Sequence, residues 1–147
     1  MTIPEKMMGV FKTEPGYDKM DFLPLDVPKA VDDKVLIKVA FTGICGSDIH
    51  TFKGEYNNPT TPVVLGHEFS GQVVAVGDQV TKVKVGDRVT SETTFETSTD
   101  IYTHDKQYNL AMWRKGIGTQ QNGSMAKYVL AREESIHILP DTLSYEG

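Results

Sequence analysis

One cysteine, one histidine and one glutamate lie in two glycine-rich segments, and their side chains could together bind a metal ion. Cys45 lies in the sequence Gly-Ile-Cys-Gly-Ser-Asp-Ile-His at residues 43–50, and it is the only cysteine in the chain. His67 and Glu68 directly follow Gly66. A thiolate, an imidazole and a carboxylate form three corners of a tetrahedral Zn²⁺ site whose fourth position stays open. The residue types therefore favour metal-assisted alcohol chemistry.

Each of these residues also has an ordinary alternative when it is considered alone. An isolated cysteine is more often a small buried hydrophobe, and an isolated His-Glu pair is more often a pair of solvated side chains. Neighbouring side chains of a strand point to opposite faces, so His67 and Glu68 reach one metal only at a bend, which Pro62 and Gly66 could supply. The combination with Cys45 favours the metal site.

The polar residues directly after Cys45 could move a proton. The Ser47 hydroxyl could receive a proton from a substrate alcohol, and His50 could carry it to solvent, because a histidine changes charge near neutral pH. Ser47 or Asp48 could instead cap the short helix expected at residues 49–53. The two roles are compatible, and we assign the relay to Ser47 and the cap to Asp48.

Three aromatic residues and two further histidines give weaker evidence of a functional role. Phe52, Tyr56 and Trp113 could line a substrate pocket, but ordinary packing is an equal alternative for each of them. His104 and His137 lie outside any recognisable motif, and we assign them no role.

Short apolar segments separated by turn signals must position these residues. The clearest alternation of side chains lies in residues 34–42, and residues 90–103 are rich in Thr, Ser, Asp and Glu, which predicts a surface excursion. Many short strands between turns predict a mainly β fold, a closed or partly closed β-barrel with short helices. The expected strands are residues 7–12, 20–27, 34–42, 63–65, 71–76, 125–130 and 135–139, and residues 85–89 are expected to be a turn that enters another strand.

The composition excludes several classes of protein. The 147 residues suggest one domain, and 39% hydrophobic and 24% charged residues are ordinary for a globular protein. A net charge of −5 argues against a nucleic-acid surface. No apolar stretch approaches the roughly 20 residues that span a bilayer, and no signal peptide is evident, so we expect a cytoplasmic location. The dinucleotide fingerprint is absent, because Gln121 replaces the third glycine after Gly116 and Gly118.

The motifs closely resemble those of the zinc-dependent medium-chain alcohol dehydrogenases, in particular the sorbitol, polyol and threonine dehydrogenase branch. The resemblance rests on residues 43–50, on Gly-His-Glu at 66–68 with the spaced residues 71, 77 and 80, and on Val-Gly-Asp-Arg-Val at 85–89. It implies that residues 1–147 form the N-terminal part of a GroES-like catalytic domain. It also implies that Cys45, His67 and Glu68 are the catalytic zinc ligands and that Ser47 and His50 form the proton relay.

The same resemblance implies an activity. Members of the family oxidise a secondary alcohol to a ketone with zinc and with NAD or NADP, which a following Rossmann domain binds. We therefore expect a polyol or amino-alcohol substrate, a homo-oligomeric full-length parent and no nucleic-acid or membrane partner. Because the Rossmann domain lies outside this chain, we expect the chain alone to be inactive. The alternatives are a non-enzymatic GroES-like folding or interaction module with vestigial ligands and a zinc-free reductase, which the three retained ligands disfavour.

One part of the resemblance fails. Many members hold a second, structural zinc with four cysteines spaced C-x2-C-x2-C-x7-C. That spacing falls here on Thr97, Asp100, Thr103 and Ala111. A closed Cys₄ site contributes folding energy that one carboxylate and two hydroxyls cannot replace by binding zinc. We therefore expect this lobe to be metal-free, and mobile unless its packing compensates.

Overall fold

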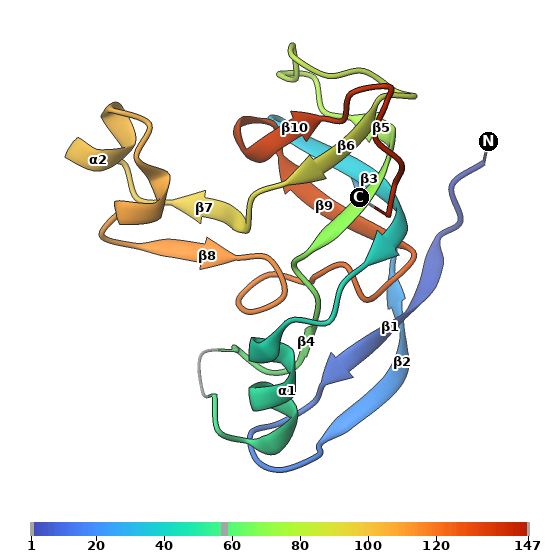
Figure 1. The fold of residues 1–147 in the computed structure, drawn as a ribbon, viewed down its shortest axis with the longest axis vertical. Helices are drawn as coiled ribbons and strands as arrows, with labels where there is room; N and C mark the ends of the chain where they lie inside the picture. Colours follow the sequence, from blue (N-terminus) through green and yellow to red (C-terminus); the bar gives the residue numbers. More distant parts are fainter. Residues whose placement is uncertain (1, 57–58, 147) are drawn as a thin grey trace.

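The computed structural model describes residues 2–56 and 59–146, which form a mainly β body with one projecting lobe (Figure 1). The strands are β1 (Lys6–Lys12), β2 (Met20–Asp26), β3 (Lys34–Thr42), β4 (Val63–Val64), β5 (Phe69–Val76), β6 (Arg88–Ser91), β7 (Thr94–Thr97), β8 (Arg114–Gly116), β9 (Tyr128–Arg132) and β10 (Ile136–Ile138). The helices are α1 (Gly46–Lys53) and α2 (Ile101–His104), with the 3₁₀ turns η1 (Tyr108–Leu110) and η2 (Glu133–Ser135). The longest described helix, α1, is too short to cross a membrane.

Three antiparallel sheets build the body and the lobe. The main sheet has the order β10-β6-β5-β3-β9, a second sheet has the order β2-β1-β4, and β7 pairs with β8. The second sheet is joined to the chain that leads into β9, since the Val10 N–H donates to the Met125 carbonyl at 2.9 Å and the Met125 N–H donates to the Leu65 carbonyl at 2.9 Å. The sheets therefore curve into a partly closed barrel, which confirms the predicted fold class.

The core lies on the main sheet and explains why β3 is at its centre. Val35 and Ile37 of β3 are fully buried, as the alternation predicts, in a cluster that also contains Val73 and Val129. Leu36 on the opposite face is also buried, against Met7 and Tyr128. Apolar packing on both faces anchors β3 between β5 and β9.

Most of the predicted strands are present, and one local prediction is wrong. Residues 34–42 match β3, and residues 85–87 form the predicted turn around Gly86, with φ of 101°, before β6 begins at Arg88. However, residues 90–103 are more than a surface excursion, because Phe95 of β7 is buried in the main core with 5% exposure. Phe95 was missed because a single aromatic residue stands among polar neighbours.

Candidate metal centre

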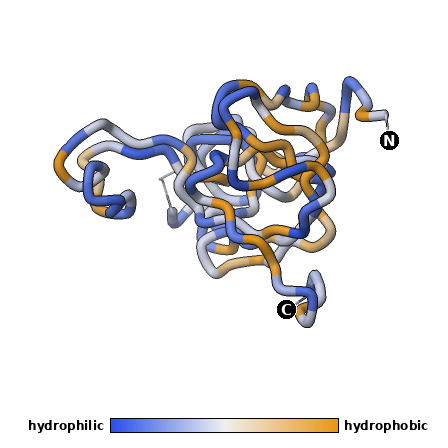
Figure 2. The backbone as a smooth tube through the Cα atoms, turned by 90° about the horizontal axis from the view of Figure 1, so that it is seen from above, coloured by the Kyte–Doolittle hydropathy of each residue, from blue (hydrophilic) through white to orange (hydrophobic). Residues whose placement is uncertain are grey.

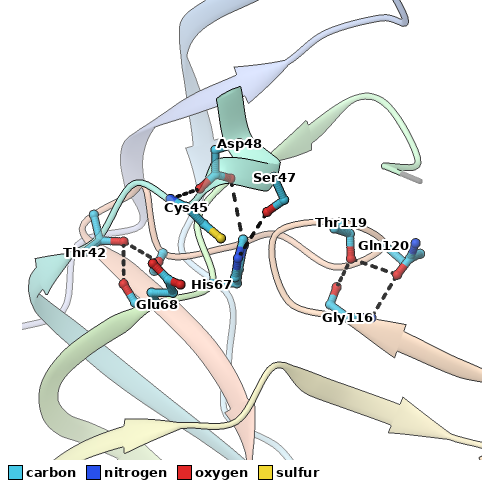
Figure 3. Close-up of polar contacts among 10 residues, drawn as sticks. Thr42, Cys45, Ser47, Asp48, His67, Glu68, Gly116, Thr119 and Gln120 are labelled. Atoms are coloured by element: carbon cyan, nitrogen blue, oxygen red, sulfur yellow. Dashed lines mark hydrogen bonds and ion pairs between the residues drawn. The ribbon is translucent and has the colours of Figure 1, made fainter. Parts of the chain in front are cut away.

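Two loops bring the three predicted ligands together. Cys45 stands at the N-terminus of α1, while His67 and Glu68 lie between β4 and β5. One donor atom from each of the three side chains lies within 4.8 Å of the other two (Figure 3). Cys45 and His67 are partly buried and Glu68 is exposed, so the cluster lies at the protein surface with an open side. A thiolate, an imidazole and a carboxylate at this separation fit the donor set of a zinc ion with an open position.

The backbone before β5 bends, so that two neighbouring residues can both reach the cluster. Gly66 has a φ of 92°, and residues 65–68 belong to no strand, so His67 and Glu68 are free of the alternation of a β-strand. The Glu68 carbonyl accepts hydrogen bonds from Gly43 N–H at 2.7 Å and from the Thr42 hydroxyl at 3.2 Å. These bonds fasten the Glu68 loop to the chain that leads to Cys45. The bend at Gly66 is the one that the sequence predicts.

Asp48 organises the other side of the cluster. Its Oδ2 accepts a hydrogen bond from the Cys45 N–H at 2.9 Å, so Asp48 does cap α1, but as the third residue of a capping box inside the helix, with Cys45 as the N-cap residue. Its Oδ1 lies 3.9 Å from Nδ1 of His67, and the Asp48 residue is 6% exposed. A buried carboxylate beside an imidazole fixes the ring orientation and favours a cation at the opposite ring nitrogen. α1 therefore begins at Gly46, three residues before the predicted start, because this cap extends it.

The two residues of the predicted proton relay have different partners in the structure. The Ser47 hydroxyl lies 3.4 Å from Nε2 of His67, at the edge of the cluster (Figure 3). The His50 side chain is 59% exposed, and its Nδ1 lies 2.7 Å from Oε2 of Glu55. Ser47 is thus placed beside a candidate ligand, whereas His50 is paired with a carboxylate farther along the chain.

A cavity of about 330 Å³ opens beside Ser47 and His67. Tyr56 lines it, as the sequence suggests, and its opposite wall is formed by β8 and the loop with Thr119 and Gln120 (Figure 3). This wall was not predicted, because polar residues far from the motifs give no local signal that they face it. The cavity gives a small polar molecule room next to the cluster.

The other aromatic candidates pack elsewhere. The ring of Phe52 lies 5.3 Å from that of Tyr17, centroid to centroid. Trp113 is 51% exposed on the lobe, where the Lys115 ammonium lies 5.4 Å from its ring centroid. Neither aromatic ring belongs to the lining of the cavity beside His67.

Asp100 organises the projecting lobe, which holds β7, α2, η1 and β8 (Figure 2). Its Oδ1 accepts hydrogen bonds from the backbone N–H groups of Tyr102 and Thr103 at 2.9 and 3.2 Å. Its Oδ2 accepts hydrogen bonds from the Ser98 hydroxyl at 2.5 Å and from Met112 N–H at 3.0 Å. One carboxylate thus joins both ends of the lobe, which is the compensation that the predicted absence of a structural zinc requires.

The substitution Asp100→Ala should release the lobe. It removes four hydrogen bonds, two of which cap α2, while Phe95 is the one residue of β7, α2, η1 and β8 that belongs to the main core. We expect several-fold faster proteolysis between residues 98 and 113 and little change in the thermal unfolding of the body. Limited proteolysis with mass spectrometry measures this. Asp105→Ala, which removes an exposed carboxylate of the same lobe, should leave the cleavage rate near that of the wild type.

The pH dependence of this lobe follows from the same contacts. The Ser98 hydroxyl, followed by the Met112 N–H, holds the pKa of Asp100 below its ordinary value of 3.8. A carboxylate with a lowered pKa in the folded state stabilises that state above its unfolded pKa, and the stabilisation is lost as the pH falls through the folded value. We expect the Asp100-dependent protection from proteolysis to hold at neutral pH and to fade below about pH 3.8. Protection that is unchanged at pH 3 would contradict this role.

Comparison with known proteins places the chain in a family. Residues 31–141 match the alcohol dehydrogenase GroES-like domain. The chain is 77% identical to D-arabitol-phosphate dehydrogenase of Enterococcus avium over 96% of its length and 40% of that protein. It is 49% identical to sorbitol dehydrogenase of Halalkalibacterium halodurans over 91% of its length and 39% of that protein. The chain thus spans about two fifths of the length of these relatives.

Solved structures agree with the sequence relatives. The 2R,3R-butanediol dehydrogenase of Bacillus subtilis superposes with a TM-score of 0.82 at 36% identity, covering 95% of this chain and 42% of that one. The NADP-bound structure of a Sinorhizobium meliloti protein superposes with a TM-score of 0.85 at 31% identity, covering 97% of this chain and 41% of that one. With three quarters of its residues matched to the family model, this chain belongs to the alcohol dehydrogenase GroES-like domain family.

Proposed function

We propose that this chain is the metal-binding part of a zinc- and NAD(P)-linked dehydrogenase that oxidises a secondary alcohol of a polyol to a ketone. The observation that carries the proposal is the meeting of Cys45, His67 and Glu68 donor atoms within 4.8 Å. The names of the relatives, which include D-arabitol-phosphate and sorbitol dehydrogenases, support the substrate class. The NADP in a structural neighbour supports the cofactor.

The residues of the chain divide the work of binding and proton transfer. A bound zinc ion would act as a Lewis acid that favours ionisation of the substrate alcohol. Cys45, His67 and Glu68 would hold it, and Asp48 would keep His67 in its orientation through the contact at 3.9 Å. Ser47 would accept the hydroxyl proton at the cavity edge and release its own proton, which His50 would take up and pass to solvent. Because His50 is exposed, transfer of a proton from Ser47 to His50 requires a rotation of the His50 side chain or an intervening water.

Hydride transfer also needs a binding site for NAD(P). The relatives are about two and a half times longer than the aligned part, and the sequence contains no dinucleotide fingerprint. We propose that residues 1–147 form the N-terminal part of the catalytic domain and that the cofactor binds outside them. The chain alone should therefore bind metal without turning over an alcohol.

Elemental analysis tests this proposal directly. The chain is purified without added metal or chelator, and zinc is measured per mole of protein. We expect about one zinc per chain, the stoichiometry of one three-ligand site. A chain without zinc would contradict the proposal and favour a non-enzymatic module with vestigial ligands. A clear excess over one would contradict the prediction that the lobe around Asp100 is metal-free.

A further inference from the structure

The cavity beside the candidate metal centre is cationic, although the chain as a whole is acidic. Arg114 and Lys115 of β8 line it, whereas no aspartate or glutamate is found among the described residues of its lining. The net charge of the chain is −5. Two basic side chains in a concave site raise the local concentration of an anion against the overall charge. The positive charge of the cavity therefore favours an anionic ligand.

The two basic side chains differ in whether a neighbouring carboxylate already pairs with them. Lys115 Nζ forms an ion pair with Glu96 Oε2 at 2.8 Å. Among the residues that the structure describes, Arg114 finds no partner for its guanidinium in a hydrogen bond or an ion pair. A guanidinium offers paired N–H donors in a planar fork that matches two oxygens of a phosphate. The hydroxyl of Thr93, in the same lining, is a further donor for such a group, whereas the Thr119 hydroxyl already donates to the Gly116 carbonyl and to Gln120 Oε1.

An anion bound at the two basic residues would lie in the same cavity as the metal centre. Ser47 and His67 line the same space as Arg114 and Lys115. A volume of about 330 Å³ lies at the lower end of the range of small-molecule sites. It suits a short acyclic molecule rather than a dinucleotide. A ligand held at Arg114 by one end can present its other end to the cluster of Cys45, His67 and Glu68.

We propose that Arg114, assisted by Lys115, binds the phosphate of a polyol phosphate whose reacting hydroxyl lies at the metal centre. This inference rests on the proposed function for the role of the hydroxyl, but not for the binding of the phosphate. It makes Arg114 a specificity-determining residue, because a sugar alcohol without phosphate leaves the guanidinium unpaired. A phosphate monoester of NADP presents the same chemistry and is the competing source.

Calorimetric titration of the 147-residue chain tests the subsite without any turnover. The probes are a pentitol phosphate, the same pentitol without phosphate, inorganic phosphate and NADP. We expect the pentitol phosphate to bind at least about tenfold more tightly than the free pentitol, since a hydrogen bond to a charged group is worth about 1.5–3 kcal/mol. Inorganic phosphate should compete with it. Tight binding of NADP with no preference for the pentitol phosphate would overturn the polyol assignment.

Matched variants locate the effect. Arg114→Gln should weaken pentitol phosphate binding by about tenfold or more and leave free pentitol binding unchanged. Lys29→Gln removes one exposed positive charge outside the cavity lining and should change neither affinity. Equal affinities of Arg114→Gln and Lys29→Gln would overturn the subsite. Loss of binding in Arg114→Gln in a chain that contains no zinc would uphold the phosphate subsite and contradict only the proposed metal chemistry.

Discussion

Replacement of Cys45 by serine should lower the zinc content of the chain from about one to near zero. Cys45 supplies the only thiolate available to the cluster, since the chain has one cysteine. A serine hydroxyl has a similar size but stays protonated at neutral pH, so His67 and Glu68 would remain as the two charged or basic donors. Two protein donors are one fewer than the three that hold zinc in a site with an open position. Elemental analysis and competition with a colorimetric chelator measure the loss.

The fold should survive this substitution, and that makes the result interpretable. Cys45 is partly exposed and lies outside the two hydrophobic clusters. We therefore expect the metal-free Cys45→Ser chain to unfold within a few degrees of the metal-free wild type. Ser47→Ala is the matched control, because it alters the same loop without removing a candidate ligand, and it should retain about one zinc. Equal zinc content in wild type and Cys45→Ser would disprove the assigned site.

The ligand cluster could be predicted from sequence because its residues carry unusual local signals. Glycines flank Cys45, and Gly66 stands directly before His67. A glycine with positive φ at position 66 allows the bend that lets both His67 and Glu68 face one point. The chemistry of a thiol and an imidazole limits what such an arrangement can bind. Donor type, glycine context and the family resemblance thus pointed to three residues whose donor atoms do lie within 4.8 Å of one another, while their role as zinc ligands stays a prediction.

The walls around the cluster could not be predicted, because they depend on distant contacts. Arg114 and Lys115 enter the cavity only because β8 pairs with β7, through the register Thr97↔Arg114 and Glu96↔Lys115. Alternation in a three-residue strand is too short to be recognised. Phe95 was missed for a similar reason, since one buried aromatic residue does not make a periodic pattern. Residues 34–42 were predicted because nine residues with alternating side chains do make one.

Gly123 holds the segment that carries His67, and its substitution by alanine should disturb both stability and metal binding. An added Cβ at Gly123 would lie 2.0 Å from the Gly66 carbonyl oxygen and 2.6 Å from that of Leu65. Both neighbours are backbone atoms, so a side-chain rotation cannot relieve the overlap. The same segment is fixed by hydrogen bonds from Gly123 N–H to Val64 O at 2.8 Å and from Ser124 N–H to Gly66 O at 2.9 Å. The backbone around residue 66 must therefore move, and His67 moves with it.

We expect Gly123→Ala to lower the free energy of unfolding of the metal-free chain by about 1–3 kcal/mol, as overpacking of a close contact does. Zinc affinity should fall as well, because the three donor atoms no longer meet within the distance found here. Gly46→Ala is the matched control, because Gly46 lies next to Cys45 and a Cβ there would meet no atom within 4 Å. Gly46 also lies in α1, where alanine is favoured over glycine. Denaturant unfolding and zinc competition measure both effects. If Gly123→Ala matched Gly46→Ala in stability and zinc affinity, the approach of Gly123 to Gly66 would not be what positions His67.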